Sequence, residues 1–226
     1  MQEIWDWINS LFPLIERGGG VMWPIVLCSL VAFAIIIERI WFLIVRSNRI
    51  VPRAFLREVE ALLDNGEIEN AVVACRKNDS MMARVLLAGL TLYGSSREVI
   101  REALEDAGRR KSRELDRFLG TLAAIAGVSP LLGLLGTVVG MIEVFQEIAS
   151  QHIGQYESLA GGIYVALYTT AAGLIVAIPA YLAYRSFQGI ADAKVRDMED
   201  LAVDILNRLD RTIPANAKNK DRETEP

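Results

Sequence analysis

Three long apolar segments constrain the fold of this chain more than any other feature. They cover residues 21–45, 119–148 and 158–184. Each is long enough to cross the hydrocarbon core of a bilayer, which takes about 20 apolar residues in a helix. Because lipid offers no hydrogen bonds, backbone N–H and C=O groups must be satisfied within each span, so the spans are expected to be helical. The sequence predicts an all-α membrane protein with three transmembrane helices.

The placement of lysine and arginine predicts how these spans are oriented. Fourteen of the basic residues lie in 46–117 and eight in 185–226, whereas the stretch before the first span has only Arg17 and the connection 147–157 has none. Positive charge is retained on the cytoplasmic side of a membrane. We therefore expect a periplasmic N-terminus, a large cytoplasmic region after the first span and a cytoplasmic C-terminus.

The remaining segments are predicted to be helical as well, with long cytoplasmic helical extensions of the spans. Apolar residues near the start recur on one helical face, which indicates an amphipathic helix on the outer membrane surface. The acidic and aromatic first residues are unlike the basic start of a signal peptide. The predicted order is a periplasmic amphipathic helix (1–20), first span (21–45), cytoplasmic helical region (46–118), second span (119–148), periplasmic loop (149–157), third span (158–184), cytoplasmic helix (185–212) and disordered tail (213–226).

Within the cytoplasmic part, two features predict long helices. Ser95 is expected to cap a helix that continues without a strong breaker from about residue 96 to 148, with a kink at Pro130. In the tail, apolar residues recur at alternating spacings of three and four, at Ala191, Val195, Met198, Ala202, Ile205 and Leu209. That seam predicts packing against another helix, either of the same chain or of a neighbouring subunit.

Composition argues against an enzyme. The chain is 52% hydrophobic and 23% charged, with the two kinds of residue segregated along the sequence. It contains one histidine, no catalytic constellation, no metal-ligand spacing and no phosphate-binding loop, so neither cofactor nor metal is expected. Twelve acidic residues nearly balance the fourteen basic ones of the cytoplasmic region, so nothing indicates nucleic-acid binding. Cys28 and Cys75 are interpreted as small apolar fillers.

Small residues on the second and third spans predict close helix packing. Their positions are Gly133, Gly136, Gly140, Gly162, Ala166, Gly173 and Ala177. Such residues let two backbones approach closely within a membrane. Thr137 and Thr170 add a hydroxyl to these faces. Their spacing leaves two interpretations open, a narrow polar passage and hydroxyls bonded back to their own helices.

Glu38 and Arg39 follow the apolar core of the first span. Adjacent positions on a helix do not face each other, so the two residues do not form a self-contained ion pair. We interpret them as marking the inner membrane interface, with the Arg39 side chain snorkelling toward water.

Two motifs resemble one family of ion-driven motor subunits. They are Pro130-Leu-Leu-Gly-Leu-Leu-Gly-Thr-Val-Val-Gly-Met-Ile142 and Ala166-Leu-Tyr-Thr-Thr-Ala-Ala-Gly-Leu-Ile-Val-Ala-Ile-Pro179. Together with Glu38-Arg39, the large loop after the first span and the topology, they resemble the ExbB/TolQ/MotA family, in its three-span ExbB/TolQ branch. The flagellar-type subunits of that family have an additional span that this chain lacks.

This resemblance implies a motor in the bacterial inner membrane. It implies a homopentamer around a dimer of an ExbD/TolR-type single-span partner, with a TonB-like or TolA-like third component. The second and third spans would line the pore, the partner would carry the titrating aspartate, and Thr137 and Thr170 match the family's pore-wall threonines. Proton-motive force would drive mechanical work on the periplasm or outer membrane. ExbB-like energisation of transport is favoured over TolQ-like envelope maintenance or a motility motor.

One departure from the family concerns Val165, which stands where ExbB and TolQ proteins commonly have a glutamate. A carboxylate at membrane depth is costly and usually functional, so its absence leaves the pore wall with hydroxyls and backbone. It also leaves sodium open as the driving ion. The alternative function is a non-conducting scaffold for a partner complex. A solute transporter is disfavoured because the chain shows neither internal repeats nor broken spans.

Overall fold

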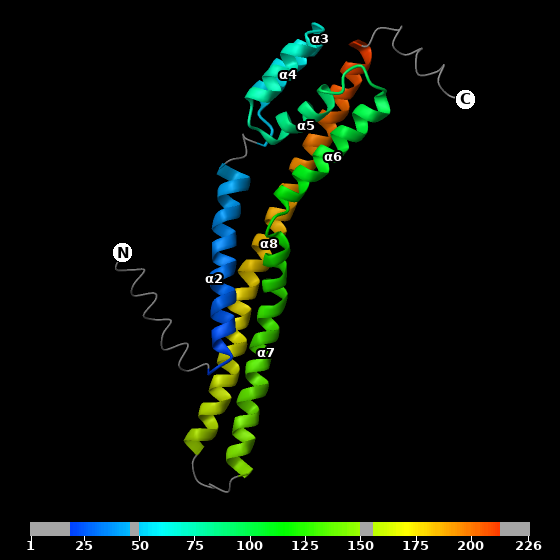
Figure 1. Ribbon diagram of the computed structural model, residues 1–226. Helices are drawn as coiled ribbons and strands as arrows, with labels where there is room; N and C mark the ends of the chain where they lie inside the picture. The colour runs from blue at the N-terminus through cyan, green and yellow to red at the C-terminus, as the bar shows by residue number, and fades with distance from the viewer. Residues whose placement is uncertain (1–18, 46–49, 150–155, 213–226) are drawn as a thin grey trace, which may run out of the picture. The chain divides into compact units, whose positions relative to one another are not determined.

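The structure is a computed structural model that describes residues 19–45, 50–149 and 156–212 (Figure 1). The predicted outer helix, the periplasmic loop and the C-terminal tail lie almost wholly outside the described residues. In the described part, the elements are helices without a strand: α2 (Met22–Arg39), η1 (Ile40–Val45), α3 (Arg53–Asp64), α4 (Ile68–Lys77), α5 (Met81–Leu90), α6 (Arg97–Leu115), α7 (Leu119–Ala149) and α8 (Tyr156–Thr212). The all-α prediction is confirmed.

Three stretches of helix are long and apolar enough to cross a membrane, as predicted. They lie within Met22–Ile44, Arg97–Gln146 and Ala160–Arg211. The apolar side chains on their outer faces are exposed. Leu131, Leu167 and Ile175, for example, are 63%, 66% and 71% exposed. A surface of this kind is costly in water but suits lipid tails.

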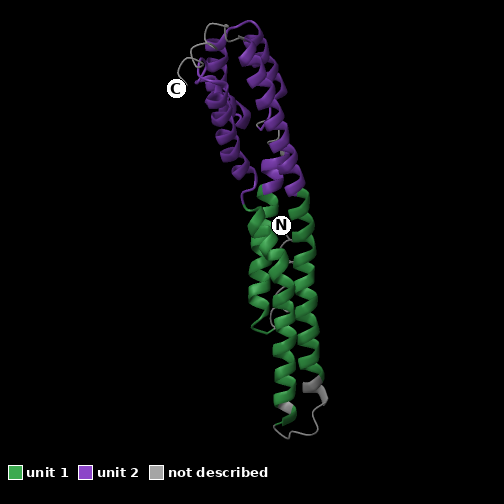
Figure 2. Ribbon diagram, turned by 90° about the vertical axis from the view of Figure 1, so that its right-hand side faces the viewer, with its two compact units in different colours: residues 1–38, 118–186 green, residues 39–117, 187–226 purple. Residues whose placement is uncertain are grey.

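The chain divides into two compact units (Figure 2). The first holds α2, α7 and the part of α8 up to Ser186, and we call it the membrane unit. The second begins at Arg39, holds η1 and α3 to α6, and includes α8 from Phe187 onward. We call it the helical unit. α8 is therefore one uninterrupted helix that belongs to both units.

Local sequence signals explain the short helices of the helical unit. α3 ends at a left-handed Gly66, which has a φ of 77°, directly after the C-cap Asn65. Glycine adopts positive φ without steric cost, so an Asn-Gly pair favours a helix C-terminus at this point. α5 starts at Ser80, whose hydroxyl oxygen accepts a hydrogen bond from the Ala83 backbone N–H. Both caps satisfy backbone groups that helix ends leave without a partner.

The predicted continuous helix from 96 to 148 is wrong, since the structure has two helices in its place. α6 ends at Leu115, and α7 begins at Leu119 after Phe118, a non-glycine residue with a φ of 64°. In a continuous helix the Leu115 carbonyl would accept the N–H of Leu119. Here it accepts a hydrogen bond of 2.9 Å from Arg39 Nη1. The N-cap of α6 is also Ser96 rather than Ser95.

The tail seam packs within its own chain, which resolves the alternative left open above. Ala191, Met198, Ile205 and Leu209 are buried, and Val195 and Ala202 are half-buried. Polar contacts fix the same stretch of α8. Arg97 of α6 contacts Asn207 and Asp210. Arg208 binds Asp64 of α3.

Candidate functional site

The helices α7 and α8 approach each other at glycines within the membrane unit. A methyl group on Gly133 would lie 3.0 Å from the Thr169 carbonyl oxygen, and one on Gly140 would lie 3.1 Å from the Gly162 carbonyl oxygen. On α8, a methyl group on Gly173 would lie 2.5 Å from the Ser129 carbonyl oxygen. A larger residue at these positions would meet backbone, which cannot move aside as a flexible side chain can.

The closest approach is at Gly136. A methyl group there would overlap the hydroxyl and Cβ of Thr169. Gly162 on α8 similarly faces the side chain of Val144. Ala166 and Ala177, the two alanines of the predicted face, are buried. Close contact of this kind replaces the hydrophobic driving force that is missing between helices in lipid.

The two predicted pore-wall threonines differ in their hydrogen bonds. The Thr137 hydroxyl donates to the Leu134 carbonyl of its own helix, at 2.6 Å. The Thr170 hydroxyl donates to the Gly133 carbonyl of the facing helix, at 3.1 Å. Thr137 therefore has the back-bonded arrangement that the sequence left open. Thr170 joins α7 to α8.

Two further hydroxyls lie in this interface and were not singled out from the sequence. Thr169 is fully buried, and its hydroxyl donates to the Ala166 carbonyl at 2.8 Å. Ser129 is also fully buried, and its Oγ has no hydrogen-bond partner within the described part of the chain. The pair Thr169-Thr170 was a visible signal, but neighbouring helical positions are 100° apart. Only the structure shows which one faces Gly136.

Arg39 is buried rather than snorkelling, so that part of the prediction is wrong. Its side chain is 1% exposed, and its guanidinium lies 5.0 Å from the centre of the Phe42 ring. The same group donates the hydrogen bond to Leu115 described above. A helix C-terminus and an aromatic face both attract a cation, which explains why the Arg39 side chain is buried at this place. Glu38 is half-buried.

The two cysteines lie in different surroundings. Cys75 in α4 is buried, and burial raises the pKa of its thiol to about 12, with a smaller contribution from the nearby Glu58 carboxylate. It is therefore a neutral, apolar filler, as interpreted from the sequence. Cys28 in α2 is half-buried. Among the described residues, no group of three or more histidine, cysteine or acidic side chains could hold a metal.

Taken together, these features define a class. The molecule is a multi-pass helical membrane protein in which two of the three apolar stretches pack through glycines, with hydroxyls between them. Residues 77–200 match the model of the MotA/TolQ/ExbB proton channel family, so the chain belongs to that family. The family consists of channel and motor subunits, and the chain is accordingly not an enzyme.

Individual relatives come from both named branches. An ExbB-like biopolymer transport protein of Synechocystis is 37% identical over 75% of this chain and 67% of its own length. The biopolymer transport protein exbB1 of Vibrio cholerae is 29% identical over 85% of each chain. The Tol-Pal system protein TolQ of Haemophilus influenzae is 30% identical over 74% of this chain and 79% of its own length.

Proposed function

We propose that this chain is the ring-forming subunit of a proton-driven motor in the bacterial inner membrane. Five copies would surround a dimer of an ExbD/TolR-type single-span partner. Proton flow between ring and partner would produce mechanical work on the periplasm or outer membrane. Support comes from the family match and from the α7–α8 pair in the membrane unit.

The contact between α7 and α8 is the observation that carries the proposal. A helix that only anchors a protein in the membrane could have leucine at these positions. Here a methyl group on Gly133, Gly136 or Gly173 would already collide with the facing helix. The Thr170 hydroxyl spans the same contact. A rigid pair with hydroxyls at membrane depth suits a wall that must hold its shape while a partner moves beside it.

In this proposal Thr137 and Thr170 border the ion path, and the small residues fix the helices that present them. Residues 119–142 and 158–184 contain no Asp or Glu. The wall therefore has no carboxylate of its own in these stretches, including at Val165. The titrating group would come from the partner, because proton transfer at membrane depth needs an ionisable side chain.

The proposed motor also has an orientation in the membrane and a system that it drives. The basic residues of 46–117 and 185–226 favour a cytoplasmic location for both regions, with Glu38 and Arg39 at the inner interface and the N-terminus in the periplasm. ExbB-like energisation of transport is favoured, with a TonB-like third component. The two less favoured roles are TolQ-like envelope maintenance, with a TolA-like component, and a motility motor.

The test compares threonine variants in the complex with its natural partner. Thr170→Val removes the hydroxyl and keeps the shape, whereas Thr170→Ser keeps the hydroxyl. We expect the valine variant to assemble normally but to lose most proton flux into vesicles, and the serine variant to retain it. Thr137→Val and Thr137→Ser form a second matched pair. If both valine variants conduct and work like the unmodified protein, the non-conducting scaffold becomes the better description.

A further inference from the structure

One hydroxyl between α7 and α8 differs from its neighbours. The hydroxyls of Thr137, Thr169 and Thr170 all donate to backbone carbonyls. Ser129 is 0% exposed, and its Oγ has no hydrogen-bond partner among the residues that the structure describes. A buried hydroxyl without a partner is costly in apolar surroundings, so this group indicates that a further molecule binds beside it.

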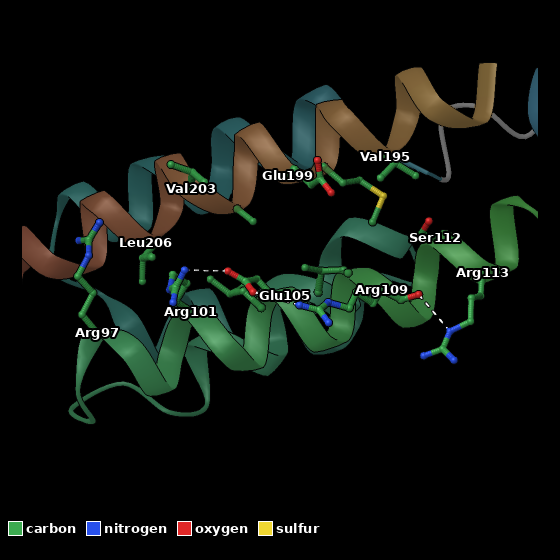
Figure 3. Close-up of a pocket in the computed structure, with 15 residues that line it drawn as sticks. Arg97, Arg101, Glu105, Arg109, Ser112, Arg113, Val195, Glu199, Val203 and Leu206 are labelled. Atoms are coloured by element: carbon green, nitrogen blue, oxygen red, sulfur yellow. Dashed lines mark hydrogen bonds and ion pairs between the residues drawn. The ribbon is translucent and has the colours of Figure 1, made fainter. Parts of the chain in front are cut away.

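A serine of the helical unit shows why the position of Ser129 matters. Ser112 is only half-buried and lines the open groove between α6 and α8, where water from the solvent can reach it (Figure 3). Ser129 lies instead in the apolar helix α7 and is fully buried. Any partner of its hydroxyl must therefore be held inside the protein.

A second polar group lies one helical turn away. Pro130 has no N–H, so the carbonyl of Ala126, four residues earlier, has no donor within the helix. Ala126 and Ser129 are three positions apart and therefore lie on one face of α7. The hydroxyls of Thr137 and Thr169 bond directly to the carbonyl three residues before them, whereas that of Ser129 does not. A proline ring clashes with the carbonyl four residues before it and pushes it aside, which accounts for the missing bond.

We propose that Ser129 Oγ and the Ala126 carbonyl oxygen together bind one water molecule inside the membrane unit. Water fits this pair because it can donate to the carbonyl and can both donate to and accept from the hydroxyl. Ordered water is one of the means by which carbonyls freed by proline are satisfied in transmembrane helices. A cation fits less well, because residues 119–142 and 158–184 contain no Asp or Glu to compensate its charge.

The bound water extends the proposed ion path, and this role rests on the proposed function. Ser129, Gly133 and Thr137 are four positions apart, which places them about 6 Å apart along the same side of α7. The Gly133 carbonyl accepts the hydrogen bond from Thr170, so each of these turns contributes an oxygen. A proton moves between atoms within hydrogen-bond distance, or through one water between them. The water at Ser129 provides such a step on the side of Thr170 that leads to Leu119.

A cryo-electron microscopy map of the complex with its natural partner, at a resolution that shows ordered waters, tests the site directly. We expect a density peak at hydrogen-bond distance from both Ser129 Oγ and the Ala126 carbonyl oxygen, in sodium buffer and equally in potassium buffer. If the hydroxyl instead bonds to the Ala126 or Ile125 carbonyl with no peak beside it, the proposal is wrong. A peak that disappears without sodium would identify a bound cation and would also overturn it.

Two substitutions remove the two halves of the site. Ser129→Ala removes the hydroxyl, and Pro130→Ala restores an N–H that can bond to the Ala126 carbonyl, so each should abolish the peak. The matched control is Ser186→Ala in α8, because the Ser186 hydroxyl bonds back to the Leu182 carbonyl of its own helix. Its map should keep the peak. A peak that persists in both site variants would show that neither group holds the water.

Proton flux into vesicles then tests the role of the water. Ser129→Ala should reduce the flux several-fold relative to the unmodified complex, and Ser186→Ala should leave it unchanged. Full flux in Ser129→Ala, with the peak gone, overturns the step on the ion path and leaves the proposed function standing. No flux in the unmodified complex overturns the proposed function, while the map still decides whether the water is bound.

Discussion

At the scale of single residues, the α7–α8 contact depends on the absence of side chains. Gly136 faces Thr169 so closely that even a methyl group would overlap it, and Thr169 is fully buried with its hydroxyl bonded to Ala166. The threonine therefore cannot move aside without losing a buried hydrogen bond. Glycine at this position is a steric requirement of the pair.

Gly136→Ala is expected to destabilise the protein, because overpacking a close contact typically costs about 1–3 kcal/mol. The matched control is Gly127→Ala in the same helix, where nothing lies within 4 Å of the added methyl group. That variant should be neutral or slightly stabilised, since alanine is a better helix former than glycine by about 0.5–1 kcal/mol. Thermal unfolding in detergent measures both. Equal midpoints for the two variants would contradict the tight α7–α8 contact.

The Cys75 thiol gives a prediction about pH. Its pKa of about 12 lies above the ordinary value of 9.0, so the folded protein holds the thiol proton more tightly than the unfolded chain does. The resulting stability is complete below pH 9 and is lost as the pH rises from about 9 to 12. Because the thiolate is the nucleophile, Cys75 should not react with a thiol reagent at pH 8.

The measurement uses a Cys28→Ser background, in which Cys75 is the one remaining thiol. Labelling should be negligible in the folded protein and complete after unfolding in denaturant. Rapid labelling of the folded protein at pH 8 would show that Cys75 is accessible and ionised.

At the scale of elements, the break between α6 and α7 shows where sequence patterns stop being informative. The α3 C-terminus at Asn65-Gly66 depends on a local signal, because an Asn-Gly pair favours a helix end through its own conformational preference. The end of α6 at Leu115 depends instead on Arg39, which is 76 positions away in sequence. No helical periodicity near Leu115 contains that information.

Arg39→Met should weaken this junction. The variant keeps most of the side-chain volume but has no donor for the Leu115 carbonyl, and a hydrogen bond involving a charged group is worth about 1.5–3 kcal/mol. Arg39→Lys keeps the charge but not the planar stacking on Phe42, so it should be intermediate. Arg76→Met, on an exposed position of α4, is the control and should change stability by less than about 0.5 kcal/mol. The thermal midpoint should therefore be lowest for Arg39→Met, intermediate for Arg39→Lys and nearly unchanged for Arg76→Met. An unchanged midpoint for Arg39→Met would refute the role of the buried guanidinium.

At the scale of the whole molecule, the sequence predicted the class and three spans, because lipid forces long apolar segments into helices. It also predicted that the tail seam packs on another helix, but not which one, since Arg97, Arg208 and Asp64 specify the partner through long-range contacts. For the candidate site, the glycine positions were visible as spacing. The hydrogen bonds of Thr137 and Thr170, and the burial of Thr169 and Ser129, depend on the rotation of two helices about their axes.

In the proposed motor, the chain builds a ring around a partner that carries the titrating group. Native mass spectrometry of the complex, purified in mild detergent with its natural partners, tests this most directly. The proposal predicts five copies of this 25.0 kDa chain with two copies of a small single-span protein that has an acidic residue in its span. A monomer, or a ring that contains no such partner, would contradict it, because the wall formed by 119–142 and 158–184 has no carboxylate to titrate.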